Sequence, residues 1–540
     1  MSLTAESPTT PPPPPAPAFN LLDSPWLPVR YLDGRNADLG LLALFEQATQ
    51  IEGLAETSPP NLVALYRLLL AITHRALTRQ LGQWTDRDRA RWYAQGLPAG
   101  AVADYLTHWR DRFWLFHAEQ PFMQVAALAT ADETRDKFKP WTQVALDSAN
   151  GNTPVVFDHA LDTDPPPVEA AVVLRHLLGF LQFTPGGLVK VFRGSDKGGP
   201  LANTAAALPL GVSLEQTLLL ALHPAVRPEA SDVPSWESPA LAVAQLLADP
   251  TPATGCCDRY TRQSRALLLL PDAALQPPAV RWIRFGAGLG LAEDDNAPDP
   301  MASYRPGSSG LVRVSFTEGR ALWRDMGALL PDATGQLARP AAVLSWAANL
   351  HDAAGHWDAE VPVLLAGLCS DKAKLVRWRA ERHALPSASF CRADMAKAVR
   401  DELLRSEDLF HQLRTIATEL LARTMPDPAS KDTRARARAV LDAGPCAATF
   451  FASAERRLPV LLRLIGQANL DAAHAEWSAT LLAAANGAWD AARGMLGQSA
   501  AALRAEALTH GKLLAALRPL RPEPNPSASQ EPTNAEEATP

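Results

Sequence analysis

Apolar residues recur at helical spacing in two parts of the chain that differ in character. Between 61 and 81, leucine and isoleucine stand three and four positions apart, which predicts an amphipathic helix. From about Ala393 to Leu517, alanine and leucine dominate and the apolar positions again follow a helical period. Breaks fall at 426–428, 443–445, 467–469 and 494–497. The second part therefore predicts four or five helices joined by short connections, as in an antiparallel bundle.

The chain before about Pro386 has a mixed pattern. Helical runs alternate with short β-like pieces such as 155–157 and 311–316. Long loops rich in Pro, Gly and Asp separate them, at 158–167, 184–200 and 292–310. Loops of this length inside a compact domain are usually functional or disordered. We therefore expect an α+β fold: a mixed N-terminal domain with long loops, followed by a C-terminal antiparallel four-helix-type bundle.

Both ends of the chain are rich in proline. The chain holds 47 prolines, and 13 of them lie in residues 1–18 and 519–540. Such segments carry few large apolar groups to offset their ordering entropy, so both are expected to be disordered. The predicted organisation is a tail over 1–18, an α+β domain over 19–388, a helical bundle over 389–518 and a second tail over 519–540.

Charge and cysteine content exclude several classes of protein. The formal net charge is -7, with 51 Lys and Arg against 58 Asp and Glu, and the two tails carry -4 of it. A body this close to neutral argues against binding of nucleic acid by bulk charge but leaves a local basic face possible. Five scattered cysteines without a C-x-x-C pair favour a reducing compartment. No apolar stretch has the length of a membrane span, so we expect a cytoplasmic protein without a membrane partner.

Basic clusters are the most suggestive polar feature. Five cations fall within eleven residues around Trp378: Lys372, Lys374, Arg377, Arg379 and Arg382. This cluster follows Gly367–Ser370, which we interpret as a turn into a helix, a good place to meet phosphate. Arg281 and Arg284 flank Trp282, and a third cluster at 434–438 is typical of a solvated helix face. Short basic sites of this kind fit local contact with nucleic acid.

An enzymatic alternative rests on one dyad. His351-Asp352, with His356 four residues on, resembles the metal-binding pair of HD-type phosphohydrolases. Such a site also needs an upstream His and a downstream Asp on facing helices, and only the dyad is apparent in this sequence. The other interpretation is a polar helix end before a turn at Gly355. Nucleophile elbows, P-loops and His-Glu-x-x-His helices are absent from the sequence.

Several stretches together resemble one family. The matching strings, in the family's order, are 19–29, 116–124, 151–157, 263–265, 299–305 and 371–374. They resemble CasA, the large subunit of the type I-E CRISPR surveillance complex Cascade, and the string Phe116–Gln124 is quite specific. The resemblance covers about residues 19–390, with a helical bundle following as the family requires.

The resemblance implies a non-catalytic subunit that recognises DNA. Such a subunit reads the short protospacer-adjacent motif in double-stranded DNA and helps to open the duplex for pairing with crRNA. The implied partners are the other Cascade subunits, crRNA, target DNA and a helicase-nuclease recruited later. Sequence specificity then rests mainly on guide pairing, as in another RNA-guided effector. No cofactor is expected.

The resemblance also implies DNA-contacting residues in two loops. The segment 150–157 is similar to the family's recognition loop, so Gly151, Asn152 and Phe157 are candidates, the alternative for Phe157 being a core strand aromatic. Gly186 and Gly187 are similar to a glycine loop that approaches the minor groove, where a missing side chain lets the backbone come close. The alternative for that loop is Gly198-Gly199.

The remaining implied contacts are cationic. Arg281 and Arg284 lie nearest to the expected position of a minor-groove finger, where a long cation meets base acceptors and negative potential. Lys372 stands where the family has a wedge glutamine, and Lys374 and Arg377 are candidates for contact with the DNA backbone. Some relatives carry zinc-binding cysteine pairs, but Cys256-Cys257 has no partner pair, so no metal is predicted.

Overall fold

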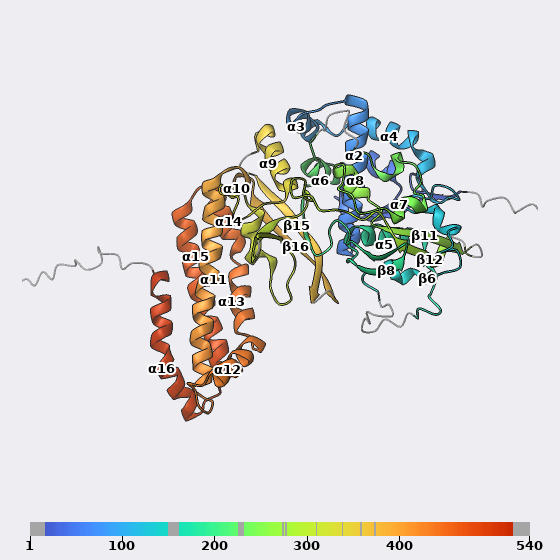
Figure 1. Cartoon of the computed structure of the whole chain (residues 1–540). Helices are drawn as coiled ribbons and strands as arrows, with labels where there is room; N and C mark the ends of the chain where they lie inside the picture. The colour runs from blue at the N-terminus through green and yellow to red at the C-terminus, as the bar shows by residue number, and fades with distance from the viewer. Residues whose placement is uncertain are drawn as a thin grey trace, which may run out of the picture. The chain divides into compact units, whose positions relative to one another are not determined.

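The structure is a computed structural model that describes residues 17–148, 161–224, 232–272, 275, 278–308, 310–336, 338–356, 359–371 and 374–521 (Figure 1). The chain divides into two compact units, Met1–Ala396 and Lys397–Pro540. The first mixes helices and strands, and the second is helical. The predicted α+β fold class with a helical C-terminal region is confirmed.

Strands and helices alternate irregularly along the first unit. Its strands are β1 (Ala18–Asn20), β2 (Leu27–Tyr31), β3 (Asn36–Leu39), β4 (Ile51–Leu54), β5 (Trp114–Phe116), β6 (Lys139–Pro140), β7 (Val168–Glu169), β8 (Gly187–Val191), β9 (Arg193–Asp196), β10 (Ala205–Pro209), β11 (Arg265–Asp272), β12 (Ala279–Ala287), β13 (Tyr304–Gly307), β14 (Gly310–Arg313), β15 (Glu360–Asp371) and β16 (Lys374–Pro386). Its helices are α1 (Leu41–Glu46), α2 (Pro59–Leu81), α3 (Asp86–Gln95), α4 (Ala99–His108), α5 (Ala170–Phe183), α6 (Leu214–Ala221), α7 (Val243–Leu247), α8 (Cys256–Thr261), α9 (Ala342–Ala354) and α10 (Ala388–Cys391).

Helix α2 is the centre of this unit. It is buried on nearly all sides, and it packs against α4, α5 and α8. A helix that is apolar all round belongs in a core, and the run of leucines from 62 to 70 has this composition. The sequence correctly predicted this helix, which begins two residues before the expected 61–81 range.

The described strands form several small antiparallel sheets rather than one large one. Their orders are β1-β5, β3-β2-β4, β8-β9, β13-β14, β10-β15-β16 and β11-β12-β6, with β7 also paired to β12. Because each sheet is narrow, its strands depend on the surrounding helices and loops for burial. Among the described candidate site residues, Gly187, Arg281, Arg284, Lys374 and Arg377 lie in strands, and Gly186 lies in the connection before β8.

The basic segment after Gly367 forms a strand, so the predicted turn into a helix is wrong. β15 and β16 make a long hairpin whose last pair before the turn is Asp371 and Lys374, with a bulge between Cys369 and Ser370. β10 pairs with the other edge of β15, but only from Val363 to Gly367. The apolar run of β15 suits a central strand. Its hydrogen-bonding edge holds the following basic segment extended, which overrides any helical preference of that segment.

The second unit is a set of helices with a shared aromatic core. Residues 393–517, all of them described, form α11 (Ala393–Ala422), α12 (Lys431–Ala443), α13 (Cys446–Glu455), α14 (Leu458–Gly466), α15 (Leu470–Gly494) and α16 (Ala500–Leu517). The Phe410 ring lies 5.2 Å from that of Phe450 and 4.7 Å from that of Phe451. The extra break before α14 coincides with Pro459 in its first turn, a position that favours helix initiation.

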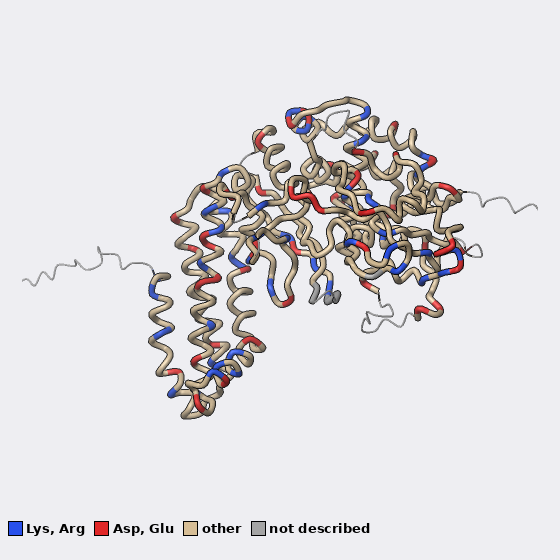
Figure 2. The backbone as a smooth tube through the Cα atoms, viewed as in Figure 1, with Lys and Arg blue, Asp and Glu red and all other residues tan. Residues whose placement is uncertain are grey.

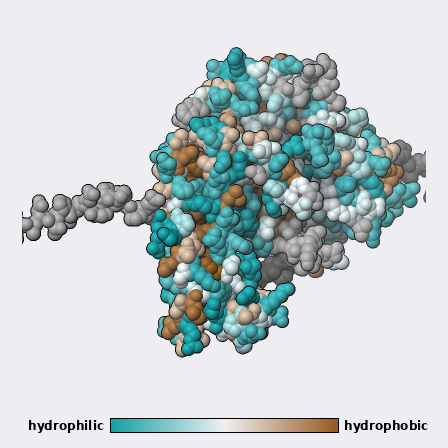
Figure 3. Space-filling model, turned by 60° about the vertical axis from the view of Figure 1, so that its left-hand side comes forward, coloured by the Kyte–Doolittle hydropathy of each residue, from teal (hydrophilic) through white to brown (hydrophobic). Residues whose placement is uncertain are grey.

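Large apolar side chains also reach the surface of this helical unit. In Figure 3 they appear as separate brown patches among teal residues. Leu404, Leu503 and Leu508 are each more than half exposed. Scattered exposure of this kind is normal for a protein surface in water. Among the described residues, the longest helices are all too polar to cross a membrane.

Candidate functional site: the basic hairpin and its neighbouring loops

Arg377 is an exposed cation of the hairpin, as is Arg382 farther along β16. The Arg377 side chain is 60% exposed, and its Nη2 lies 2.6 Å from Oε1 of Glu318. The other oxygen of Glu318 accepts a hydrogen bond from the thiol of Cys369 at 3.6 Å. A surface ion pair of this kind contributes at most about 1 kcal/mol to stability, so Arg377 can exchange its partner at little cost. Lys374 is the first residue of β16 and pairs with Asp371. Lys372 lies outside the described residues.

Arg379, in contrast to Arg377, is held by several contacts within the protein. Its guanidinium donates to the carbonyl oxygens of Thr317 at 3.2 Å and Arg320 at 2.8 Å, pairs with Glu381 and lies over the ring of Phe316. Burial alone would raise the pKa of Glu381, but hydrogen bonds from His383 and the Leu322 amide, together with Arg379, hold that pKa below its usual value. These contacts fasten the base of β16 to the segment 316–322.

Trp378 joins the hairpin to two other candidate segments. Its indole Nε1 donates to the carbonyl oxygen of Leu146 at 3.2 Å, and its ring meets Phe183 edge-on at 5.6 Å. Leu146 stands five residues before Gly151, and Phe183 stands three residues before Gly186. The structure therefore brings together the base of the basic hairpin, the start of the segment leading to the predicted recognition loop, and the start of the glycine loop.

Removing the Trp378 indole should loosen both neighbouring segments. Trp378→Phe keeps an aromatic edge against Phe183 but loses the hydrogen bond to Leu146, at a cost of about 1 kcal/mol. Trp378→Ala loses both contacts. We expect amide hydrogen exchange in 141–148 and 180–187 to accelerate modestly in the Phe variant and strongly in the Ala variant, as measured by mass spectrometry. Equal exchange in all three proteins would show that Trp378 does not anchor these segments.

The two candidate glycine pairs, Gly186-Gly187 and Gly198-Gly199, pack against each other. Gly186 and Gly187 are exposed, and Gly187 begins β8. The amide of Gly199 donates to the carbonyl of Thr184 at 2.8 Å, and a Cβ on Gly186 would stand 3.1 Å from the amide nitrogen of Gly198. The two glycine pairs therefore lie against one another. A Cβ on Gly199 would come within 2.5 Å of a backbone oxygen, so Gly199 is required for packing, whereas one on Gly187 would meet nothing.

Arg281 and Arg284 lie on β12 and are engaged within the protein. Arg284 donates to the carbonyls of Leu128 at 3.4 Å and Arg135 at 3.0 Å. Arg281 donates to the carbonyl of Pro165 at 3.0 Å and lies 3.6 Å from a carboxylate oxygen of Asp272. Both guanidiniums therefore hold neighbouring loops. Arg281, with 36% of its side chain exposed, keeps an accessible charge.

Gly151, Asn152 and Phe157 lie outside the described residues, so the structure gives no geometry for the predicted recognition loop. The described segments on either side of it have defined contacts. Leu146 is bonded to Trp378, and the segment after the loop reaches Arg281 through Pro165. The choice between a DNA-contacting and a core role for Phe157 stays open.

The His351-Asp352 dyad lies at a helix end. His351 is buried in the last turn of α9, Asp352 is exposed, and Gly355 follows in the left-handed conformation. Burial lowers the pKa of His351, and His356 lowers it further. Among the described residues, neither His351 nor Asp352 belongs to a group of three potential metal ligands. This geometry favours the helix-end interpretation.

Charges are mixed over the surface rather than segregated. Figure 2 shows Lys and Arg interspersed with Asp and Glu, with local runs on β16 and on α12. On α12, Arg434 and Arg436 are exposed and Arg438 is half-buried. The basic sites are therefore local, as the near-neutral body of the chain suggested.

Comparisons with known proteins identify the family. The family model described as CRISPR-associated protein Cse1 matches residues 20–488. The CRISPR-associated protein CasA/Cse1 of Thermus thermophilus is 32% identical over 498 residues, which cover 90% of this chain and 95% of that protein. The chain belongs to the Cse1 (CasA) family of CRISPR-associated proteins, which confirms the resemblance seen in the sequence.

Solved structures share the fold over nearly the whole chain. The crystal structure of Thermus thermophilus CasA superimposes with a TM-score of 0.79 at 30% identity, covering 93% of this chain and 99% of that one. Cse1 from Acidimicrobium ferrooxidans gives 0.74 at 23% identity, with 94% and 99% coverage. A chain of a structure described as a CRISPR RNA-guided surveillance complex gives 0.70 at 22% identity, with 92% and 100% coverage.

Proposed function

We propose that this protein is the large, non-catalytic subunit of a type I-E Cascade complex, and that it recognises the protospacer-adjacent motif in duplex DNA and promotes strand opening. Family membership supports the first part, as does the shared fold with a chain from an RNA-guided surveillance complex. The observation that supports the second part is the contact set of Trp378, which joins the basic hairpin to the segment before the predicted recognition loop and to the start of the glycine loop.

The proposed DNA contacts follow from the geometry of these segments. Lys374 and Arg377, near the free end of the hairpin, neutralise phosphates of the duplex. The exposed Gly186 and Gly187 allow the backbone to approach the minor groove, where no side chain is needed to sense groove width. Lys372, which precedes β16 by two positions in the sequence, acts where strand separation begins, and its aliphatic stem and charge replace the amide contact of a glutamine.

The cationic finger is assigned to Arg281 in preference to Arg284. The side chain of Arg281 is 36% exposed, and its ion-pair distances of 3.6 and 3.9 Å are long. A phosphate or base acceptor can therefore compete with these carboxylates. Arg284 would have to give up two backbone carbonyls, which it holds together with a contact over the ring of Phe138.

The proposal is tested by reconstitution of the complex. The chain is expected to co-purify with an assembly that contains crRNA, and that assembly should bind duplex DNA in a motif-dependent manner only when the chain is present. Gel-shift titrations on duplexes that differ only in the flanking motif measure this effect. An assembly whose motif preference is the same with and without the chain would refute the DNA-recognition role.

The helicase-nuclease and the other Cascade subunits are the remaining proposed partners. The exposed leucines of the helical unit offer apolar contact area for such subunits, although they are dispersed. Recruitment of the nuclease should depend on assembly with crRNA and DNA, which pull-down experiments with and without target duplex can measure.

A further inference from the structure

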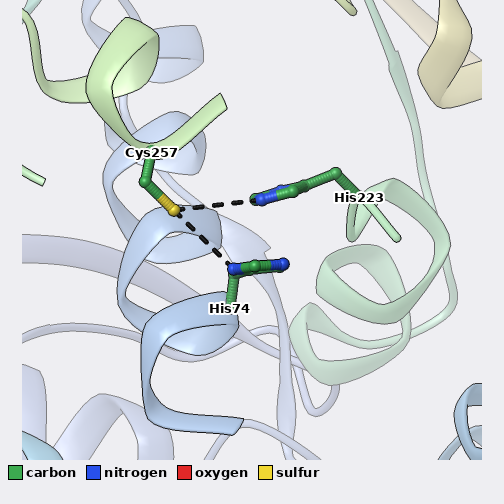
Figure 4. A group of neighbouring side chains, drawn as sticks. All are labelled: His74, His223 and Cys257. Carbon is green, nitrogen blue, oxygen red and sulfur yellow. Dashed lines mark hydrogen bonds between the residues drawn. The ribbon is translucent and has the colours of Figure 1, made fainter. Parts of the chain in front are cut away.

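Three potential metal ligands meet in the core of the first unit, and none of them belongs to the site described above. His74 lies on α2, His223 lies two residues after α6, and Cys257 lies on α8 (Figure 4). All three side chains are buried, with at most 2% of any of them exposed. Sγ of Cys257 lies 3.7 Å from Nδ1 of His74 and 3.9 Å from Nε2 of His223.

These separations suit tetrahedral coordination. A zinc ion binds thiolate sulfur at about 2.3 Å and imidazole nitrogen at about 2.0 to 2.1 Å, so two such ligands of one ion stand roughly 3.5 Å apart. The potential donor atoms of the three residues all lie within 4.8 Å of one another. Small movements therefore bring all three to one ion.

The surroundings of His74 already favour it as a ligand. Nε2 of His74 lies 3.2 Å from the carbonyl oxygen of Pro224, which can only accept a hydrogen bond, so Nε2 carries the proton. Nδ1 therefore carries a lone pair, which faces the sulfur and has the Thr78 hydroxyl 3.5 Å away. A backbone carbonyl that fixes the tautomer in this way is typical of metal-bound histidine.

The backbone of Cys257 is held in place by a buried carboxylate. The carboxylate of Asp232, itself buried, accepts hydrogen bonds from the amides of Cys257 at 3.0 Å and Asp258 at 2.9 Å. These bonds fix the first turn of α8 and direct the Cys257 side chain toward α2.

One ring must turn before both histidines can bind the same ion. The two imidazoles are stacked, with centroids 3.6 Å apart and planes 13° from parallel, whereas in-plane lone pairs must converge on the metal. His223 is the ring that can turn, because its Nδ1 finds no hydrogen-bond partner among the described residues. Rotation of His223 about its side-chain bonds aims Nε2 at the point between the sulfur and His74.

We propose that Nδ1 of His74, Nε2 of His223 and Sγ of Cys257 bind one thiophilic divalent cation of the zinc class. Such an ion ties α2, α8 and the segment after α6 together in the core. A water molecule completes a four-coordinate sphere. The expectation of no metal considered cysteine pairs alone, and this cluster pairs one cysteine with two histidines instead.

Metal content and cobalt spectroscopy of the purified full-length chain test the site. We expect about one equivalent of zinc per chain after purification without chelator. After zinc is removed, Co²⁺ should restore occupancy and give a thiolate-to-cobalt charge-transfer band together with the intense d–d absorption of a tetrahedral site. Less than about one tenth of an equivalent of zinc, with no charge-transfer band on Co²⁺ addition, would overturn the proposal without recourse to any variant.

Variants assign the ligands. Cys257→Ala should abolish the charge-transfer band, and His223→Gln should lower metal occupancy at least tenfold. Cys256→Ala is the matched control, because it removes the neighbouring thiol, which is not one of the three ligands. Circular dichroism checks that each variant is folded. If Cys257→Ala is unfolded, the metal occupancy of His223→Gln tests the ligand set. A band that persists in folded Cys257→Ala, or equal loss in Cys256→Ala, would reject this ligand set.

Discussion

Replacing Asp299 with Ala should destabilise the first unit by about 3 to 5 kcal/mol, because it leaves the Arg67 guanidinium buried without a counter-charge. Nη2 of Arg67 lies 2.7 Å from Oδ2 of Asp299, and neither side chain is exposed. The other nitrogens of Arg67 find no hydrogen-bond partner among the described residues, although the guanidinium also lies over the ring of Tyr260. Asp299 further accepts from the amide of Met301 at 3.0 Å.

Hydrogen exchange of the slowest α2 amides measures this loss, since these amides open only when the unit unfolds. The expected acceleration is about 10²- to 4 × 10³-fold, at 1.4 kcal/mol for each factor of ten. The control is Glu52→Ala, which removes an exposed partner of Arg30 and should change exchange little. Equal effects of the two substitutions would contradict the role of the buried pair.

The Arg67–Asp299 pair also makes the stability of the first unit depend on pH. Burial alone would raise the pKa of Asp299, but Arg67, Arg259 and Arg313 together hold that pKa below its usual value. A carboxylate with a depressed folded-state pKa contributes stability that is complete above its unfolded pKa of about 3.9 and is lost as the pH falls through the folded pKa. The difference between the wild type and Asp299→Asn should therefore be full at neutral pH and shrink in acid.

The double substitution Lys374→Ala and Arg377→Ala should weaken duplex binding by the assembled complex about tenfold to a hundredfold at roughly 0.1 M salt. The slope of log affinity against log salt should flatten by about 1.8, because each lost phosphate contact removes about 0.9. Titrations at several salt concentrations measure the slope. Arg377 pairs with the exposed Glu318, so its removal should cost the fold little.

A matched pair of cations elsewhere on the same unit serves as the control. Arg30 and Arg35 are 60% and 62% exposed and are likewise paired with single carboxylates. Their double Ala variant removes the same charge from the protein. An unchanged slope in the hairpin variant, or an equal change in both variants, would reject contact between the hairpin and DNA.

Local sequence pattern was sufficient for α2 and for the helical character of residues 393–517, although it predicted four or five helices there and the structure has six. The burial of α2 follows from its leucines, and most breaks of the C-terminal helices follow from Pro and Gly positions. The hairpin was missed because its basic half has no alternation strong enough to distinguish strand from helix. Only the apolar run of β15, paired on both edges near its base, determines that the following segment is extended.

The site could be predicted only in part, because its geometry depends on contacts between distant residues. Some of the stretches that resemble the family lie in or next to the segments that Trp378 joins. In the sequence, Trp378 itself was notable only as an aromatic residue within a basic cluster. The position of Leu146, 232 residues before it, was not accessible from the sequence. His74 and Cys257 lie 183 residues apart, and two single histidines and one cysteine carry no spacing signal.

The uneven support of the β15–β16 hairpin has a mechanical consequence. Its base is clamped by β10 on one edge and by the bonds of Arg379 to residues 317 and 320. Beyond Gly367, β10 no longer pairs with β15, an isolated bridge joins Cys369 to Phe316, and the bulge that follows interrupts the ladder. The arm beyond the bulge therefore has the fewest supporting contacts, so we expect a load on it to bend the hairpin at the bulge and to reach Leu146 and Phe183 through Trp378.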